Sequence, residues 1–431
     1  MGTSAILGFG QTGQAVAAYL TAQGGAYTVY ERRENLAYFS KRYPHLTFRE
    51  FGSPMREKTL YRSPGIRPDA VAIRRAVAGG ATLTSEIETF CRLCPAPIYG
   101  VTGSDGKTTT ATLAARLLEA RGDTVWLGGN IGRPLLPLLG EIRPHHRVVL
   151  ELSSFQLMTF ACTVYAGAVT NLTDNHLDWH TDREEYRGAK RNLLLHARRR
   201  VQNARHLLAP ELGGVTVSAY VDNANYYLQN NSLWHGEERL CHVEEMLVGG
   251  IHNLENLLTA VALTQTGRAE VARVLPRFRG VEHRMSYVGR YRGVDCYDSS
   301  IDTTPARTAV TLSTTRKPCT VLCGGRPKGV PNAPLTDALL QYATHAVFVG
   351  ESGETMREDL LTDPRYTGAP TTEYYPDFTR AVRRALAATP EGGMLVLSPA
   401  ATSFDAFSSY KERGKRFCEI LESQAPTGAK K

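Results

Sequence analysis

The chain has 431 residues, of which 42% are hydrophobic, and its formal net charge is +8. At about 150 residues per domain, this length predicts about three domains, and the apolar content suffices for a buried core in each. The charge suits small anionic substrates, but no concentrated basic patch argues for a nucleic-acid partner. The only notable basic run, Arg198–Arg200, is interpreted as a solvated helix face.

Membrane and secretion signals are not recognised in the sequence. No apolar stretch approaches the roughly 20 residues that a membrane-spanning helix needs, and no signal peptide is evident. Of the eight cysteines, Cys91 and Cys94 form a single CxxC pair. A zinc site of this type needs a second pair, so zinc is not expected. The cysteines are interpreted as reduced, and the protein as cytoplasmic.

Residues 4–20, "SAILGFGQTGQAVAAYL", predict a strand, a glycine turn and a helix. Gly8, Gly10 and Gly13 form a GxGxxG motif, and Glu31 ends the next predicted strand, where a dinucleotide-binding fold has a ribose-binding acid. Taken alone, the motif allows three interpretations: a dehydrogenase, a turn that holds a uridine diphosphate, or plain helix–strand packing. The dehydrogenase interpretation leaves the next motif unexplained.

The stretch "VTGSDGKTTT", residues 101–110, predicts a phosphate loop. A buried strand over 96–102 precedes it and an amphipathic helix over 109–120 follows it. The common pattern has a glycine where Val101 stands, so this loop is shorter than usual. Its glycines still let backbone N–H groups turn toward an anion at a helix N-terminus. Lys107 supplies a charge for the outer phosphates, and the Thr108 hydroxyl can reach Mg²⁺.

Three further residues are candidates for a metal site. Glu151 ends an apolar strand in "VVLELSSFQ", which places it to hold Mg²⁺, although a helix-capping or ion-paired acid is the alternative. His176 ends a later strand in "NLTDNHLDWH", and Lys190 follows on the next predicted helix. Lysine is a poor metal ligand until its charge is removed. Carbamylation by CO₂ would give Lys190 a carboxylate-like group, and a surface lysine is the alternative.

The last third of the chain alternates strands, at 319–325, 345–351 and 393–400, with helices such as 377–388. Such alternation predicts parallel sheets with helices on both faces. The expected fold is α/β with three domains. They are a Rossmann-like domain over 1–94, a central P-loop ATPase domain with a mostly parallel sheet over 95–280, and a Rossmann-like C-terminal domain over 281–431.

Taken together, these motifs resemble those of the Mur ligases of peptidoglycan synthesis. The phosphate loop of that family is the short GxxGK[TS] form seen at Gly103–Thr108. The resemblance spans nearly the whole chain, and several motifs in one order make it specific. Besides the stretches quoted above, it includes "SPGI" at 63–66, "GGNIG" at 128–132, "YRGAK" at 186–190, "GIHNLEN" at 250–256, "GGRPKG" at 324–329 and "SPAATSFDAF" at 398–407.

Within the family, the chain is most similar to the branch that adds D-glutamate to UDP-N-acetylmuramoyl-L-alanine. The N-terminal GxGxxG block fits that branch, and the DNPR-type motif of the diaminopimelate- or lysine-adding members is not present. The resemblance implies an ATP-dependent amide ligase of cell-wall precursor synthesis that works through an acyl phosphate. It also implies two Mg²⁺ ions, a carbamylated lysine, small-molecule substrates and a monomeric cytoplasmic enzyme.

The roles of individual residues are implied by their match to the family motifs. Lys107, His176 and Lys190 would be catalytic. Nucleotide binding would fall to Gly103, Ser104, Asp105, Gly106, Lys107, Thr108, Thr109, Asn253, Asn256 and Arg284. The metal ligands would be Thr108, Glu151, His176 and carbamylated Lys190. The UDP-sugar would contact Gln11, Thr12, Arg32, Arg33, Ser63, Asn130 and Gln156. The acceptor would contact Thr303, Lys328, Ser403, Phe404 and Tyr410.

One segment departs from the family pattern. The glutamate-adding branch commonly has "NDSKAT" where this chain has "DSSIDT", residues 298–303, so Ile301 takes the place of a lysine that contacts substrate. Two other functions compete with the ligase. A folylpolyglutamate-synthase type of ligase would lack the N-terminal nucleotide block, and a phosphate-loop switch protein would not need His176, Lys190 and a third domain.

Overall fold

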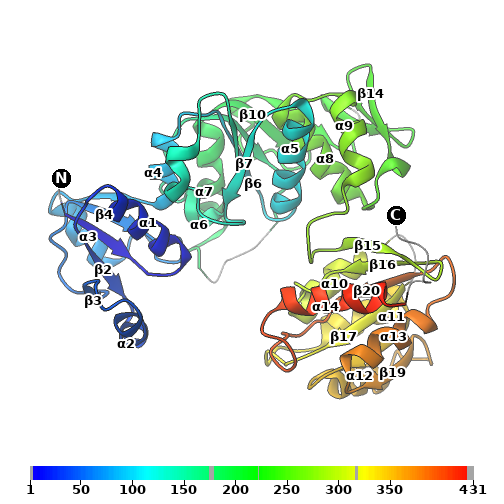
Figure 1. Cartoon of the computed structure of the whole chain (residues 1–431). Coiled ribbons are helices and arrows are strands. Elements are labelled where there is room, and N and C mark those ends of the chain that lie inside the picture. Colours follow the sequence, from blue (N-terminus) through cyan, green and yellow to red (C-terminus); the bar gives the residue numbers. More distant parts are fainter. Residues whose placement is uncertain (1–2, 174–178, 222, 316–318, 425–431) are drawn as a thin grey trace. The chain divides into compact units, whose positions relative to one another are not determined.

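The computed structural model describes residues 3–173, 179–221, 223–315 and 319–424. They form three sheets in chain order, each with its own helices (Figure 1). Each sheet together with its helices is called a block, and the blocks are numbered one to three in chain order. The first sheet has five parallel strands in the order β3-β2-β1-β4-β5. Its elements are β1 Ser4–Leu7, α1 Gln11–Ala22, β2 Tyr27–Glu31, α2 Arg33–Arg42, β3 Phe48–Glu50, β4 Thr59–Arg62, α3 Val71–Ala78, β5 Thr82–Thr84 and α4 Glu86–Leu93.

The second sheet has nine strands in the order β14-β13-β12-β11-β10-β9-β6-β8-β7. Its pairs are parallel from β7 to β12, and a meander of β12, β13 and β14 adds two antiparallel pairs. The helices of this block are α5 Lys107–Arg121, α6 Ser154–Leu157, α7 Arg183–Leu195, α8 Ile251–Thr264 and α9 Arg268–Val274, with short 3₁₀ helices η1 Leu136–Glu141, η2 Pro210–Leu212, η3 Val243–Glu245 and η4 Leu275–Arg277. The strands are β6 Ile98–Thr102, β7 Val125–Gly129, β8 Arg147–Glu151, β9 Val164–Val169, β10 Ala197–Asn203, β11 Val215–Ser218, β12 Tyr226–Gln229, β13 Ser232–His235 and β14 Glu238–His242.

The third sheet has six strands in the order β15-β16-β20-β17-β18-β19 and is parallel except for the β15–β16 hairpin. Its elements are β15 Ser286–Tyr291, β16 Val294–Asp298, α10 Pro305–Ser313, β17 Cys319–Gly324, α11 Ala333–Tyr342, β18 Ala343–Val349, α12 Gly353–Leu361, β19 Thr371–Tyr375, α13 Phe378–Ala388, β20 Met394–Leu397 and α14 Tyr410–Glu422. The predicted α/β class with mostly parallel sheets is confirmed.

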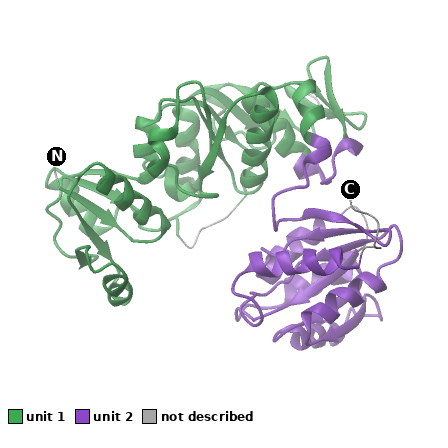
Figure 2. Cartoon of the chain, in the orientation of Figure 1, with its two compact units in different colours: residues 1–242, 254–274 green, residues 243–253, 275–431 purple. Residues whose placement is uncertain are grey.

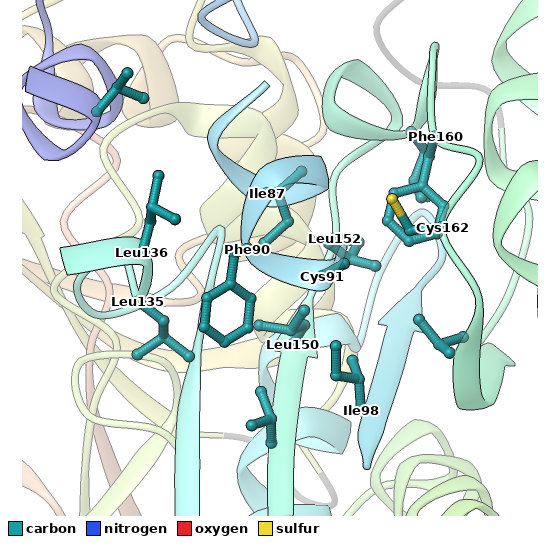
Figure 3. Close-up of a cluster of buried hydrophobic side chains, with 14 of the residues drawn as sticks. Ile87, Phe90, Cys91, Ile98, Leu135, Leu136, Leu150, Leu152, Phe160 and Cys162 are labelled. Carbon is teal, nitrogen blue, oxygen red and sulfur yellow. The ribbon is translucent and has the colours of Figure 1, made fainter. Parts of the chain in front are cut away.

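The chain divides into two compact units, 1–242 with 254–274 and 243–253 with 275–431 (Figure 2). The first unit contains the first two sheets. A shared core joins them: Ile87 and Phe90 of α4 lie in one cluster with Leu135, Leu136 and Leu150 of the second block (Figure 3). Each of these side chains is at most 3% exposed. The domain boundaries after residues 94 and 280 remain a prediction.

One element was predicted incorrectly. Arg198–Arg200 do not form a solvated helix face; they lie in β10, where Arg199 pairs with Ala166 of β9. Arginine is a good helix former, but pairing with β9 and β11 overrides that weak local preference. The Arg200 guanidinium, moreover, donates to the carbonyls of Leu194 and Leu212.

The eight cysteines form no disulfide, and Cys319 and Cys323 lie in a core cluster of the third sheet and its helices. Among the helices in the described parts of the chain, none combines the length and apolarity that crossing a membrane requires.

Candidate active site

The phosphate loop connects β6 to α5. Gly103 and Gly106 have φ of +148° and +76°, backbone conformations that favour glycine. Gly106 also lies against α8, because a Cβ there would come 2.2 Å from Asn256 Oδ1. The helix begins at Lys107, so its first backbone N–H groups face the loop. Leu113, Leu117 and Leu118 are fully buried, which confirms the predicted apolar face of the helix.

A carboxylate stands next to the start of α5. Glu151, at the end of β8, is 2% exposed. Its Oε2 accepts a hydrogen bond from Thr108 Oγ1 at 2.7 Å, and its Oε1 accepts one from Asn130 Nδ2 at 2.8 Å. The last residue of β7, Gly129, leaves room for this close strand pairing, since a Cβ there would lie 2.2 Å from the Glu151 carbonyl oxygen. Carboxylate and hydroxyl oxygens beside a phosphate loop are the ligands that Mg²⁺ prefers, with the rest supplied by phosphate and water.

Two lysines converge on the same loop carbonyl. Lys190 Nζ, from α7, donates to Gly103 O at 2.7 Å, and Lys107 Nζ donates to Gly103 O at 3.0 Å and to Ser104 O at 2.7 Å. Lys190 is only 2% exposed. Burial, and then the nearby charge of Lys107, lower the pKa of Lys190 to about 6. Because Lys190 is buried, the surface-lysine alternative is wrong, and its lowered pKa favours the uncharged amine at neutral pH.

The other predicted nucleotide residues are placed as follows. Ser104 is buried and its hydroxyl lies 2.7 Å from the Tyr186 hydroxyl, Asp105 is exposed at the tip of the loop, and Thr109 is buried in α5. Asn256 is buried, and its Oδ1 accepts from Thr110 Oγ1 at 3.2 Å. Asn253 and Arg284 belong to the second unit. His176 lies outside the described residues.

Glu31, the candidate ribose ligand, stabilises the GxGxxG turn. Glu31 Oε2 accepts from the Phe9 backbone N–H at 2.6 Å, and Oε1 accepts from the Arg32 N–H at 2.8 Å. Glu31 is 7% exposed, and its carboxylate accepts hydrogen bonds from the turn at Phe9 and from the start of α2. Gly13 allows the close packing, since a Cβ there would come 2.0 Å from Gly8 O. This arrangement argues against a dehydrogenase site.

The predicted UDP-sugar residues gather at one edge of the first sheet. Gln11 and Thr12 open α1 after β1, Arg32 and Arg33 follow β2 with exposed side chains, and Ser63 follows β4. Parallel strands end at the same edge, and the Ser63 hydroxyl donates to Gly8 O at 3.1 Å. Gln156 is different: it lies in α6, where its Oε1 accepts from the Ser153 backbone in a capping box.

The predicted acceptor residues lie in the second unit, on loops after three adjacent strands. Thr303 follows β16, Lys328 follows β17, and Ser403 and Phe404 follow β20. Lys328 Nζ donates to Thr303 Oγ1 at 3.0 Å, and Arg326 pairs with Thr402, so the loops run side by side. Ser403 is 2% exposed, whereas Phe404 is 59% exposed, and Tyr410 begins α14.

Sequence reasoning missed a polar network beside the phosphate loop. Arg67, Glu185, His180 and Ser154 form it through hydrogen bonds. The His180 ring packs against Tyr186, whose hydroxyl lies 2.7 Å from Ser104 Oγ. The members of the network are separated by up to 118 positions, the span from Arg67 to Glu185. A signal was present only locally, in the His, Glu and Tyr of "HTDREEY" at 180–186.

Comparison with known proteins agrees with this geometry. Residues 101–264 match the model of the Mur ligase middle domain. The chain is 34% identical over 394 residues to the UDP-N-acetylmuramoylalanine--D-glutamate ligase of Ruminiclostridium cellulolyticum, covering 84% of this chain and 82% of the relative. It is 33% identical over 448 residues to the ligase of the same name from Clostridium perfringens, covering 97% and 96%.

Solved structures support the fold. The UDP-N-acetylmuramate-alanine ligase of Thermotoga maritima aligns with a TM-score of 0.60 at 20% identity, over 98% of this chain and all of that one. A UDP-N-acetylmuramoyl-L-alanyl-D-glutamate--2,6-diaminopimelate ligase aligns with a TM-score of 0.60 at 17% identity, over 95% and 89%. With relatives this similar over most of their length, the chain belongs to the Mur ligase family, and within it is similar to the D-glutamate ligases.

Proposed function

We propose that this chain joins D-glutamate to UDP-N-acetylmuramoyl-L-alanine at the expense of ATP, as a monomeric cytoplasmic enzyme of peptidoglycan precursor synthesis. The observation that carries the proposal is the cluster at the phosphate loop, where Thr108 donates to Glu151 and Lys190 donates to the Gly103 carbonyl. Relatives with the corresponding name support the substrate assignment. Cysteines that form no disulfide fit a reducing compartment.

The reaction takes two steps. An oxygen of the donor carboxylate attacks the γ-phosphorus of ATP, which forms an acyl phosphate and releases ADP. The amine of glutamate then attacks the acyl carbon, loses a proton, and expels inorganic phosphate as the amide forms. The protein contributes mainly position and charge neutralisation. Lys107 and the N-terminus of α5 hold the phosphates, and Asn130 orients Glu151 from the opposite side of the carboxylate.

Metal binding fits the oxygen donors of this cluster. Thr108 and Glu151 would hold one Mg²⁺, which supplies charge neutralisation at the phosphates when bound. His176 and Lys190 would serve a second ion, with Lys190 as the carbamate. The buried amine of Lys190 is suited to react with CO₂, because burial lowers its pKa to about 6 and thereby favours the unprotonated form at neutral pH.

The acceptor site is assigned to the loops after β16, β17 and β20. D-Glutamate has two carboxylates, so its site needs cations and hydroxyl or N–H donors. Lys328 and Thr303 meet at 3.0 Å and supply one of each. Ile301, in the place of the family lysine, contributes no charge, so Lys328 takes a larger share of carboxylate binding.

The function is tested with the purified chain, ATP, Mg²⁺ and UDP-N-acetylmuramoyl-L-alanine, offering D-glutamate, L-glutamate, L-alanine or diaminopimelate in turn. Of these four acceptors, we expect only D-glutamate to give phosphate release. Lys328→Ala should lower kcat/KM for D-glutamate about 10- to 150-fold, the equivalent of a lost charged hydrogen bond of about 1.5–3 kcal/mol. Lys415→Ala, at an exposed position of α14, is the control. Preference for another acceptor would reject the D-glutamate assignment.

The carbamate is tested by ¹³C NMR of the protein in ¹³C-bicarbonate. We expect a carbamate carbon signal that grows as pH rises through about 6, because only the neutral amine reacts and the Lys190 pKa is about 6. Lys190→Ala should abolish both this signal and ligase turnover without lowering the melting temperature greatly. A signal that persists in Lys190→Ala, or full ligase activity of this variant, would reject the carbamate.

A further inference from the structure

Arg67 makes five hydrogen bonds from a turn that also carries Ser63. It lies between β4 and α3 and joins the first block to the second. Its Nε and Nη2 donate to Asp69 at 2.9 Å each, and its Nη1 and Nη2 donate to Glu185 at 3.1 and 2.8 Å. Nη1 also donates to the Trp179 carbonyl at 2.8 Å. A guanidinium has five N–H groups in a rigid fork, so Arg67 is held in one orientation.

Glu185 passes this contact into the second block. It stands in the first turn of α7, the helix that carries Lys190. Its Oε2 accepts from the Thr181 backbone N–H at 2.9 Å and lies 3.1 Å from His180 Nδ1. Hydrogen bonds from Arg67 lower the pKa of Glu185 to about 2. An ionised carboxylate can only accept, so His180 Nδ1 carries the proton.

His180 continues the network toward α6. Its Nε2 lies 2.9 Å from the hydroxyl of Ser154, the first residue of α6, three residues after Glu151. His180 is 3% exposed, and its ring is packed among Phe155, Trp179 and Tyr186. Ring packing continues the route, because the Tyr186 ring centroid lies 5.4 Å from that of His180 in an edge-to-face contact. The Tyr186 hydroxyl lies 2.7 Å from Ser104 Oγ in the phosphate loop, and Lys190 Nζ lies 4.6 Å from the Tyr186 ring centroid.

Two simpler interpretations fit less well. The order Ser154, His180, Glu185 matches that of a hydrolytic triad, but Ser154 is only 2% exposed, so a substrate carbonyl does not reach its hydroxyl. A surface ion pair, such as Arg365 with Asp363, has an arginine side chain 60% exposed and contributes little. The Arg67 and Glu185 side chains are 25% and 21% exposed, and their network contacts the phosphate loop through the ring of Tyr186.

We propose that Arg67 is a positioning residue that couples binding of the UDP-sugar at the Ser63 turn to nucleotide binding at the phosphate loop, acting through Glu185 and His180. The inference rests on the proposed function and on the motif-based prediction that Ser63 contacts the UDP-sugar. Order imposed on residues 63–69 by the sugar nucleotide passes to the first turn of α7 and to the start of α6. It reaches Ser104 through Tyr186.

The coupling is measured with the full chain as the change in Kd of a non-hydrolysable ATP analogue with Mg²⁺ when UDP-N-acetylmuramoyl-L-alanine is saturating. In wild type we expect the analogue to bind about 5- to 150-fold more tightly with the UDP-substrate present. In Arg67→Ala, the UDP-substrate should change the Kd of the analogue by no more than about 2-fold. The Kd of the analogue measured without the UDP-substrate should differ from wild type by less than about 3-fold. A merely structural role would weaken both affinities and leave their ratio unchanged.

Three further variants sharpen the test. Arg67→Lys keeps the charge but not the fork, so it should not restore the coupling. Glu185→Gln leaves Arg67 in place and should also lose the coupling. This variant tests the proposal independently if Arg67→Ala lowers the melting temperature. Arg75→Ala, at an exposed position of α3, should keep the wild-type factor. Failure of wild type to bind the UDP-substrate would reject the proposed function. Binding without coupling in wild type, or wild-type coupling in Arg67→Ala and Glu185→Gln, would overturn this inference.

Discussion

Gly106 and Gly122 stand at the two ends of α5 with left-handed backbones, φ +76° and +102°. An alanine in this conformation costs roughly 1–2 kcal/mol. The two sites differ in their surroundings: a Cβ at Gly106 would lie 2.2 Å from Asn256 Oδ1, whereas nothing lies within 4 Å of one at Gly122. Gly122→Ala therefore meets the backbone cost alone, and Gly106→Ala must also displace the Asn256 side chain or the phosphate loop.

We expect both variants to unfold at lower urea concentration, with the larger shift for Gly106→Ala. Only Gly106→Ala should also weaken binding of an ATP analogue, by about tenfold or more, because a displacement near 1 Å misplaces the N–H groups that face the phosphates. The measurements are urea unfolding curves and analogue Kd values for the matched pair. Equal Kd values would show that the contact with Asn256 does not shape the loop.

At the scale of the element, α7 carries both Lys190 and Glu185, and its N-terminus is capped by Asp182, which accepts from the Glu185 N–H at 2.8 Å. Asp377 caps α13 in the same way, accepting from the Arg380 N–H at 2.6 Å. Replacing either by alanine should cost about 1 kcal/mol of stability. Only Asp182→Ala should lower kcat, several-fold, since it loosens the turn that holds Glu185. Matching kcat values for the two variants would contradict a role of the α7 cap in turnover.

At the scale of the whole molecule, the two compact units have separate cores. Unfolding by heat should then show two transitions, not one. The predicted UDP-sugar turn lies in the first unit, so a UDP-substrate concentration of 100 times Kd should stabilise that unit by about 2.7 kcal/mol and raise one transition. Scanning calorimetry of the full chain with and without the UDP-substrate measures this. A single transition that shifts as a whole would show that the units unfold together.

The sequence by itself determined the features whose physics is local. The phosphate loop could be predicted because left-handed glycines, a lysine and the start of an amphipathic helix lie within a few consecutive residues of Gly103. The same holds for the GxGxxG turn and for the alternation that indicated an α/β fold with mostly parallel sheets. Motifs in a fixed order added the family.

Tertiary structure decided which distant groups meet. Lys190 lies 87 positions from the Gly103 carbonyl that it contacts, and only the packing of α7 against the central sheet buries its amine and lowers its pKa. Arg67 contacts Glu185, which is 118 positions away in the sequence. The sequence allows Glu31 as a ribose ligand, but in the folded turn its carboxylate accepts a hydrogen bond from the Phe9 N–H. The helix prediction for the β10 arginines was wrong for the same reason. Strand pairing with β9 is a long-range interaction, and local propensity does not include it.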